Sequence, residues 1–249
     1  MPDSVNPPNL ILFLTDDHGH WTLPCYGNRI VRSPALSALA KRGMVYDRAF
    51  TPSPVCSPAR ASLLTGRIPS AHGIHDWIPE ARDDGSFPHI DSMPGNLAER
   101  LHQAGYETAY VGKYHCNHAH ANPLGFDYWF TQKPPVQYDC SRQQVWFDNG
   151  QERLQEGPQG TVVTEAALRF LKSRNTEKPF CLIIGHTNTH TPHTGEDAAR
   201  VRYYQEKKDL GVDLEAFSEA HGRARFLPRE EALDRHQQLA QYFAAVESI

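Results

Sequence analysis

The sequence predicts a layered α/β domain with a largely parallel central sheet and helices on both faces. Three strand patterns, at residues 9–17, 106–112 and 179–187, alternate with amphipathic helix patterns. The first and third, NLILFLTDD and PFCLIIGHT, are continuous apolar runs that end in polar side chains, as is typical of strands buried on both faces. Ligands bind beyond the carboxyl ends of parallel strands, so the residues that follow these runs are the first site candidates.

The first predicted helix covers residues 33–43, SPALSALAKRG. Ser33 is its expected N-cap, Pro34 suits the first helical position and Gly43 ends it. Residues 44–50, MVYDRAF, are predicted to form a short strand.

Three further helices and two long loops complete the prediction. The helices are expected at residues 94–105, 161–174 and 229–249, and the last has apolar residues at helical spacing, at Leu233, Leu239, Tyr242, Phe243 and Val246. Residues 114–160 and 191–228 are rich in Pro, Gly, Asn and charge, which favours long loops.

Composition excludes several classes of protein. A formal net charge of -4 gives no electrostatic basis for binding nucleic acid or an anionic membrane. The longest apolar run, residues 10–14, is far shorter than the roughly 20 residues that a spanning helix needs. No Lys or Arg precedes that run, so we expect no secretory leader and a cytoplasmic location. Five cysteines without a C-x-x-C pair argue against a disulfide framework and indicate reduced thiols.

Residues 54–66, PVCSPARASLLTG, combine a cysteine with a predicted helix start. Pro58 suits the first turn of a helix, so Cys56 or Ser57 is the expected cap, where backbone N–H groups favour negative charge. Arg60, one turn later, carries five donors in a fork shaped for oxyanions. The alternative is that Cys56 is a small buried hydrophobic residue.

The C-x-P-x-R pattern followed by ASLLTG resembles the first signature of the sulfatase family, with Ala59 where many relatives have serine. Residues 105–115, GYETAYVGKYH, are similar to the family's second signature. The resemblance implies that a separate formylglycine-generating enzyme converts Cys56 to formylglycine. The hydrated aldehyde then offers one oxygen to attack sulfur, and its second hydroxyl permits release of sulfate without water attacking sulfur.

The resemblance also assigns two residues of the second signature. Lys113 is implied to contact the sulfate and the formylglycine, and His115 to hydrogen-bond the diol and help remove its proton. A lysine at the end of a buried strand needs an anionic partner, and histidine titrates near neutral pH. The alternative is a lysine that reaches water and a histidine on a loop.

Asp16 and Asp17 close the first predicted strand. Adjacent aspartates are often turn formers or helix caps, but two repelling carboxylates also favour a hard divalent cation. By resemblance the cation is Ca²⁺, sometimes Mg²⁺, with Asp16, Asp17 and an oxygen of modified Cys56 as ligands, and it polarises the sulfate.

Residues 186–194, HTNTHTPHT, resemble the family's P-H-x-P segment, with Thr189 where proline is usual. This match makes His190 the residue that hydrogen-bonds the sulfate and protonates the leaving oxygen. His186 and His193 are close alternatives, and a plain polar loop is another. A zinc site at the histidine-rich residues 18–20 or 115–120 is not expected, because no cysteine lies at finger spacing.

The resemblance covers residues 9–249 and implies an alkaline-phosphatase-like fold that continues beyond them in the family. The family's later acidic strand, a further lysine and a small C-terminal subdomain have no counterpart here, so residues 1–249 are expected to be the N-terminal part of one sulfatase catalytic domain. We then expect an exposed apolar sheet edge and an under-coordinated cation.

The expected activity is hydrolysis of a sulfate ester or N-sulfate on a small or saccharide substrate. Two alternatives stay open at this stage. One is a phosphonate or phosphate ester hydrolase, which uses the same nucleophile, and the other is an inactive truncated fragment that binds sulfated ligands.

Overall fold

The computed structural model describes residues 7–79, 88, 90–91, 93–116, 123–136, 138, 143–212 and 235–249. The chain divides into two compact units. The first comprises Met1–Asp16, Phe50–Gln137 and Arg142–Thr187, and the second comprises Asp17–Ala49, Tyr138–Ser141 and Asn188–Ile249. Each unit is described by itself.

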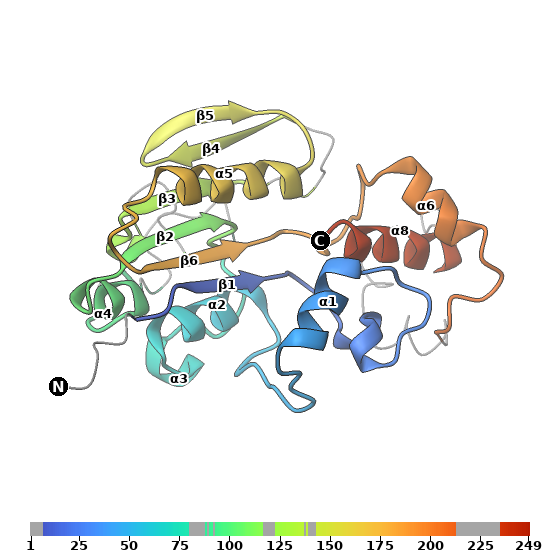
Figure 1. Ribbon diagram of the computed structural model, residues 1–249, viewed down its shortest axis with the longest axis horizontal. Coiled ribbons are helices and arrows are strands. Elements are labelled where there is room, and N and C mark those ends of the chain that lie inside the picture. Colours follow the sequence, from blue (N-terminus) through green and yellow to red (C-terminus); the bar gives the residue numbers. More distant parts are fainter. Residues whose placement is uncertain are drawn as a thin grey trace. The chain divides into compact units, whose positions relative to one another are not determined.

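The first unit contains a six-stranded sheet in the order β1-β6-β2-β3-β4-β5 (Figure 1). The first four of these strands are parallel to one another, and the pairs β3–β4 and β4–β5 are antiparallel. Their bounds are β1 Leu10–Leu14, β2 Glu107–Gly112, β3 Tyr128–Gln132, β4 Gln144–Asp148, β5 Gln151–Gln155 and β6 Phe180–Gly185.

Helices cover both faces of this sheet. Side chains alternate along β2 and β6, so successive residues pack against helices on opposite faces. Tyr110 of β2 packs in an apolar cluster with residues of α2 (Cys56–Thr65) and α4 (Leu97–Gln103), near the short α3 (Pro69–His72). Its neighbours on β2 pack instead against α5 (Gln159–Ser173), on the other face. The predicted largely parallel sheet with helices on both faces is confirmed.

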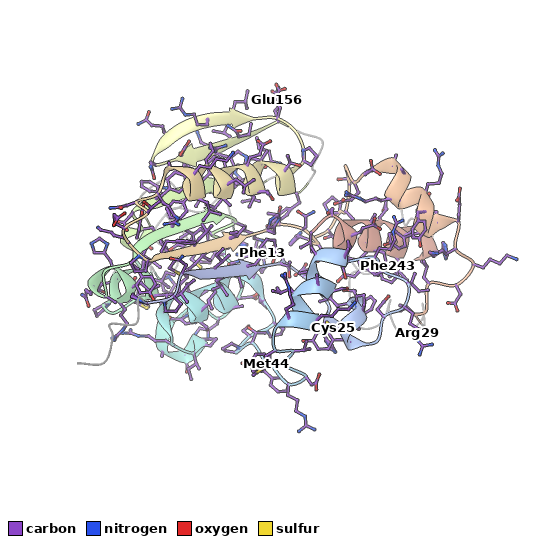
Figure 2. All side chains as sticks on the ribbon, in the orientation of Figure 1. Phe13, Cys25, Arg29, Met44, Glu156 and Phe243 are labelled. Atoms are coloured by element: carbon purple, nitrogen blue, oxygen red, sulfur yellow. The ribbon has the colours of Figure 1, made fainter. Side chains whose placement is uncertain are left out.

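Strand β1 forms one edge of the sheet, and β6 is its only partner among the described strands. Leu12 and Leu14 pack against the cluster that holds Tyr110. On the opposite face, Ile11 is 56% exposed and Phe13 is 42% exposed. Figure 2 labels Phe13 on this strand. In the described part of the chain, the expected exposed apolar edge is therefore confirmed.

The second unit packs around helices α6 (Ala198–Gln205) and α8 (Arg235–Glu247). Tyr204, Leu239 and Phe243 are fully buried in its core. It also contains α1 (Pro34–Arg42) and two 3-10 helices, η1 (His20–Thr22) and η2 (Pro24–Tyr26). The terminal helix is confirmed from Arg235 onward, whereas Leu233 lies outside the described residues.

The prediction of long loops was wrong for parts of both segments. Residues 114–160 contain the short 3-10 helix η3 (Pro123–Gly125) and strands β3, β4 and β5, and residues 191–228 contain α6. Asn149 and Gly150 both have positive φ, 48° and 82°, and join β4 to β5. Asn-Gly between segments of alternating apolar and polar residues is a strong hairpin signal. The polar composition of the whole segment favours a loop and does not reveal this turn.

The predicted strand at residues 44–50 was also wrong. Met44 is 76% exposed, Tyr46 is 64% exposed and Phe50 is 87% exposed. Figure 2 labels Met44 in this segment. None of the described strands pairs with this segment. A β pattern alone does not make a strand, because the backbone N–H and C=O groups need a neighbouring strand with which to form hydrogen bonds.

Two expectations from composition concern thiols and membranes. Among the described residues, Cys25, Cys56, Cys116 and Cys181 are free thiols, and Cys140 lies outside them. No helix in the described ranges is long and apolar enough to cross a membrane.

Candidate active site at the ends of the parallel strands

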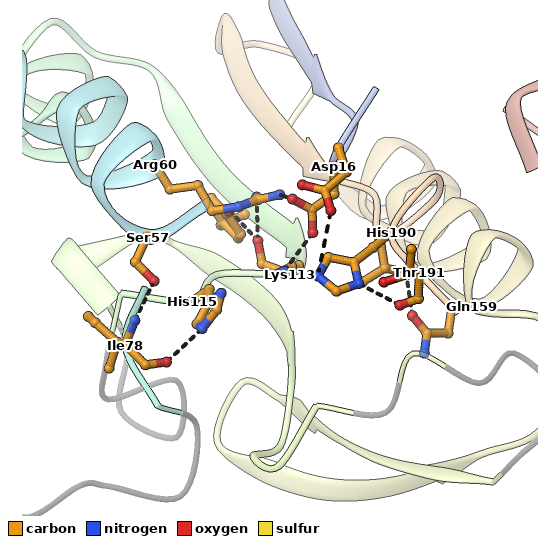
Figure 3. Close-up of polar contacts among 12 residues, drawn as sticks. Asp16, Ser57, Arg60, Ile78, Lys113, His115, Gln159, His190 and Thr191 are labelled. Atoms are coloured by element: carbon orange, nitrogen blue, oxygen red, sulfur yellow. Dashed lines mark hydrogen bonds and ion pairs between the residues drawn. The ribbon is translucent and has the colours of Figure 1, made fainter. Parts of the chain in front are cut away.

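Charged side chains of the first unit meet where β1 and β2 end. Asp16 follows β1 by two residues and is 5% exposed, and Lys113 directly follows β2 and is completely buried. Lys113 Nζ lies 2.6 Å from Asp16 Oδ2 (Figure 3). The two strands flank β6, so their carboxyl ends lie at one end of the sheet.

Arg60 joins this cluster from the second turn of α2. Its Nη2 lies 3.8 Å from Asp16 Oδ1, and its Nη1 donates to the carbonyl oxygen of Lys113 at 2.8 Å. The same Nη1 lies 3.3 Å from the hydroxyl of Tyr110, which itself donates to the Lys113 carbonyl at 2.6 Å. Two buried basic groups thus surround one carboxylate, an arrangement that can accept a further anion.

Cys56 is the first residue of α2, and Val55 is the N-cap residue. The expected cap at Cys56 or Ser57 was wrong by one residue, since the helix starts earlier than Pro58 suggested. Burial raises the pKa of the Cys56 thiol, Lys113 lowers this pKa and Asp16 raises it. The thiol is therefore neutral near pH 7 and lies in the field of the charged cluster.

Two glycines make the close approach of these groups possible. Gly112, with φ of 106°, pairs in register with Gly185 of β6. A Cβ at Gly112 would collide with the Gly185 carbonyl, and one at Gly185 would collide with the Lys113 carbonyl and Arg60 Nη1. The Gly-Lys dipeptide of the second signature therefore has a steric reason.

His115 lies two residues beyond Lys113 in the left-handed region, with φ of 52°. Its Nε2 donates to the carbonyl oxygen of Ile78 at 2.9 Å, because a carbonyl only accepts (Figure 3). Burial, and next the charge of Lys113, lower its pKa to about 4. His115 is therefore neutral near pH 7, with its lone pair on Nδ1.

Asp17 and His190 belong to the second unit. Asp17 has φ of 54°, and its Oδ2 lies 3.9 Å from His190 Nε2. His190 Nδ1 donates to the Thr191 carbonyl at 2.6 Å, and its ring stacks on Tyr138 with centroids 3.8 Å apart. Whether these residues join the first-unit cluster stays a prediction.

The two alternative histidines have different surroundings. His186 is 3% exposed and stacks on Phe13 of β1, with ring centroids 4.6 Å apart. His193 has φ of 58° and its ring lies 5.3 Å from that of Tyr242. The assignment of the acid to His190 stays a prediction.

Sequence reasoning found Cys56, Arg60, Lys113, His115 and Asp16, which the structure brings to one end of one sheet. It missed Tyr110, Ser57 and the backbone of Ile78, which hold these side chains in place. Tyr110 lies within the second signature, but nothing in the sequence marks Ile78.

The family model of the sulfatases matches residues 8–249, nearly the whole chain. The chain belongs to the sulfatase family. This sulfatase chain is 28% identical over 189 residues to N-acetylglucosamine-6-O-sulfatase of Bacteroides thetaiotaomicron, covering 76% of this chain and 32% of that protein. It is 32% identical over 213 residues to N-acetylgalactosamine-6-sulfatase of Canis lupus familiaris, covering 75% and 40%.

Solved structures confirm the sulfatase fold. BT4656 in complex with its substrate D-glucosamine-2-N,6-O-disulfate gives a TM-score of 0.65 at 20% identity, over 97% of this chain and 58% of that one. Ps i-CgsB in complex with k-i-k-neocarrahexaose gives 0.74 at 22% identity, over 97% and 53%. The sulfatase chain thus spans between about a third and three fifths of these proteins' lengths.

Sulfatases generally use a formylglycine and a divalent cation. Asp16 and Asp17 offer oxygen donors of the kind that Ca²⁺ and Mg²⁺ prefer. Within the described ranges, however, no group of three or more His, Cys, Asp or Glu side chains is arranged to hold a metal ion. Asp16 is engaged by Lys113 and Arg60 instead. The carboxylate oxygens of the described residues are of the type that binds a hard cation, but they are too few to complete its coordination.

Proposed function

We propose that this chain supplies the N-terminal part of a single sulfatase catalytic domain that hydrolyses sulfate esters or N-sulfates, with Cys56 converted to formylglycine. The observation that carries the proposal is the position of Cys56 at the start of α2, in the electrostatic field of Lys113, Asp16 and Arg60. A cysteine packed among apolar side chains away from these groups would have ended it.

The raised pKa of Cys56 supports conversion rather than direct use of the thiol. The thiolate is the nucleophilic form of cysteine, and burial keeps this side chain as the thiol. Formylglycine, when present, supplies an oxygen nucleophile that needs only a nearby proton acceptor. A formylglycine-generating enzyme is therefore the proposed partner in maturation.

The described side chains support distinct roles in this reaction. Lys113 and Arg60 carry two positive charges, and the Asp16 carboxylate that faces both compensates one of them. The remaining positive charge would balance that of a bound sulfate. His115, neutral near pH 7, would accept the proton of the nucleophilic hydroxyl at Nδ1. We assign protonation of the leaving oxygen to His190, and Ca²⁺ or Mg²⁺ ligation to Asp16, Asp17 and modified Cys56.

The proposed substrate is a sulfated saccharide. Relatives are named N-acetylglucosamine-6-O-sulfatase and N-acetylgalactosamine-6-sulfatase, and BT4656 was solved with a disulfated glucosamine. A phosphonate or phosphate ester hydrolase is not favoured, since these relatives are named for sulfates.

Mass spectrometry tests the proposal directly. The chain is co-expressed with a formylglycine-generating enzyme, and the tryptic peptide of residues 49–60 is weighed. We expect a peptide about 18 Da lighter than the cysteine form, because sulfur is exchanged for oxygen with loss of two hydrogens. A peptide that keeps the cysteine mass, although a sulfatase made in the same cells is converted, contradicts the proposal.

Activity separates a sulfatase from an inert fragment. Hydrolysis of an aryl sulfate and of a 6-sulfated N-acetylhexosamine is compared with that of an aryl phosphate, with and without Ca²⁺. Loss of the nucleophile in Cys56→Ala should remove turnover, by roughly 10⁴-fold or more. Converted protein that neither turns over sulfate esters nor binds Ca²⁺ and sulfate saturably in calorimetry is the outcome that favours an inert fragment.

A further inference from the structure

The first turn of α2 is bonded to the loop that carries His115 through the backbone of one residue, Ile78. Ser57 Oγ accepts a hydrogen bond from Ile78 N at 3.0 Å, and the Ile78 carbonyl accepts one from His115 Nε2 at 2.9 Å (Figure 3). Ser57 is fully buried and Ile78 is 2% exposed, so the bond between them is shielded from bulk water, and the bond of His115 to Ile78 is partly buried. Ser57 is also the direct neighbour of Cys56.

The Ser57 hydroxyl bonds outside its own helix. Val55 is the N-cap residue and Ser57 is the second residue of α2, so Ser57 is not in the position from which a serine caps a helix. Here the start of α2 has no side-chain cap, and the Ser57 hydroxyl accepts from a residue 21 positions away. The Ser57 carbonyl in addition lies 3.8 Å from Cys116 Sγ, the thiol next to His115 in sequence. Two separate contacts thus hold the His115 loop against α2.

The chemistry of the bond to Ile78 sets the state of the imidazole. A carbonyl oxygen only accepts, so the proton of a neutral His115 is on Nε2 and the lone pair is on Nδ1. If the Ile78 backbone moved, Nε2 would lose its acceptor and the other tautomer would become accessible. The hydroxyl of Ser57 opposes such a movement, because it holds the N–H of the same residue, in the peptide group directly before the one that carries the acceptor carbonyl.

We propose that Ser57 is a positioning residue that, through the backbone of Ile78, fixes the orientation and tautomer in which His115 presents Nδ1 as a proton acceptor. This inference rests on the proposed sulfatase function. The second position of the C-x-P-x-R pattern then has a task of its own, separate from recognition by the maturing enzyme.

Nitrogen NMR of the 249-residue chain, labelled at histidine, tests the proposal without requiring activity. We expect the His115 ring, assigned by loss of its signals in His115→Gln, to carry its proton on Nε2. In Ser57→Ala we expect a mixture of tautomers, and in Ser57→Thr the original state. A wild-type His115 protonated on Nδ1, or a tautomer unchanged in Ser57→Ala, overturns the proposal. The wild-type measurement decides even if Ser57→Ala does not fold.

Ser62→Ala is the matched control. Ser62 lies on the same helix, is 7% exposed, and hydrogen-bonds His72 Nε2 at 3.0 Å. Removing its hydroxyl should lower the Tm comparably and leave the His115 signals unchanged. An equal change of the His115 signals in Ser62→Ala would show a general structural effect and overturn the proposal.

Kinetics of converted protein provide the second readout. Loss of a group that orients a functional histidine typically costs about 10- to 100-fold in activity. We expect Ser57→Ala to lower kcat by about tenfold or more with little change in KM, Ser57→Thr to restore it and Ser62→Ala to keep it. The mass of the peptide of residues 49–60 is checked in each variant. Absence of formylglycine and turnover in the wild type would refute the function, and the tautomer result would still decide the role of Ser57.

Discussion

At the carboxyl ends of β1 and β2, charged side chains are buried, whereas along β1 itself apolar side chains are exposed. Lys113 is completely buried against Asp16, but Ile11 is 56% exposed on the strand that leads to Asp16. Buried charges are tolerated only when they are paired, and exposed apolar residues carry no such requirement. Substitutions should therefore have large effects at the charged end and small effects along the edge.

The largest effect on stability is expected from Lys113→Met. It removes the basic group 2.6 Å from the buried Asp16 carboxylate, whereas Arg60 lies 3.8 Å away, and breaking a buried pair costs about 3–5 kcal/mol. Urea unfolding of the 249-residue chain measures the loss. The double variant Lys113→Met with Asp16→Leu should recover part of it, and a double variant no more stable than the single one would contradict the pairing.

The next effect tests the glycine that precedes this lysine. Gly112→Ala places a Cβ against the Gly185 carbonyl at a φ of 106°, which should cost about 3 kcal/mol. Gly157→Ala is the matched control, because Gly157 also has positive φ, 96°, but no atom lies within 4 Å of its added Cβ. We expect a smaller loss there, of about 1 kcal/mol. Equal losses would show that the close approach of β2 and β6 is unimportant.

Acid should weaken the charged end through His115. Its pKa is lowered from 6.5 to about 4 on folding, so the unfolded chain takes up the proton first. This contribution to stability is complete above about pH 6.5 and is lost as the pH falls toward 4, by up to roughly 3 kcal/mol. Urea unfolding at pH 7.5 and pH 5 should show a smaller difference in His115→Gln than in the wild type. The exposed His75→Gln serves as control, and an unchanged difference in His115→Gln speaks against the buried neutral imidazole.

The smallest effect on stability is expected at the exposed edge. Ile11→Thr and Phe13→Ser should change the free energy of unfolding by no more than about 0.5 kcal/mol, apart from the stacking of Phe13 on His186. Light scattering should show less self-association, because exposed apolar strands at a sheet edge pair with other chains. A large loss of stability in Ile11→Thr would mean that this face is covered.

Much of the fold and of the candidate site could be predicted because the signals are local. Strands β1, β2 and β6 are apolar runs that end at the residues of interest, so their sequence pattern predicts Asp16 and Lys113 at one end of the sheet. What could not be predicted depends on partners distant in sequence. The ion pairs of the Asp16 carboxylate with Lys113 and Arg60, for example, join residues that lie 97 and 44 positions apart, and no local pattern indicates them.

The errors follow the same rule. The segment from Met44 to Phe50 has a β pattern, but a strand exists only with a neighbour, and the described sheet offers none. The hairpin of β4 and β5 was missed because composition was weighed above the Asn149-Gly150 turn. The link from Ser57 to His115 passes through a backbone group, which carries no sequence signal at all.

The facing pair Gly112 and Gly185 has a consequence for how this site can vary. Two strands meet there through backbone alone, and the Lys113 carbonyl and one guanidinium nitrogen of Arg60 lie beside Gly185. A methyl group added at Gly112 would meet the Gly185 carbonyl, and one added at Gly185 would meet the Lys113 carbonyl and Arg60. Variation near this end of the sheet is therefore expected in the surrounding loops, whereas these two positions are restricted to glycine.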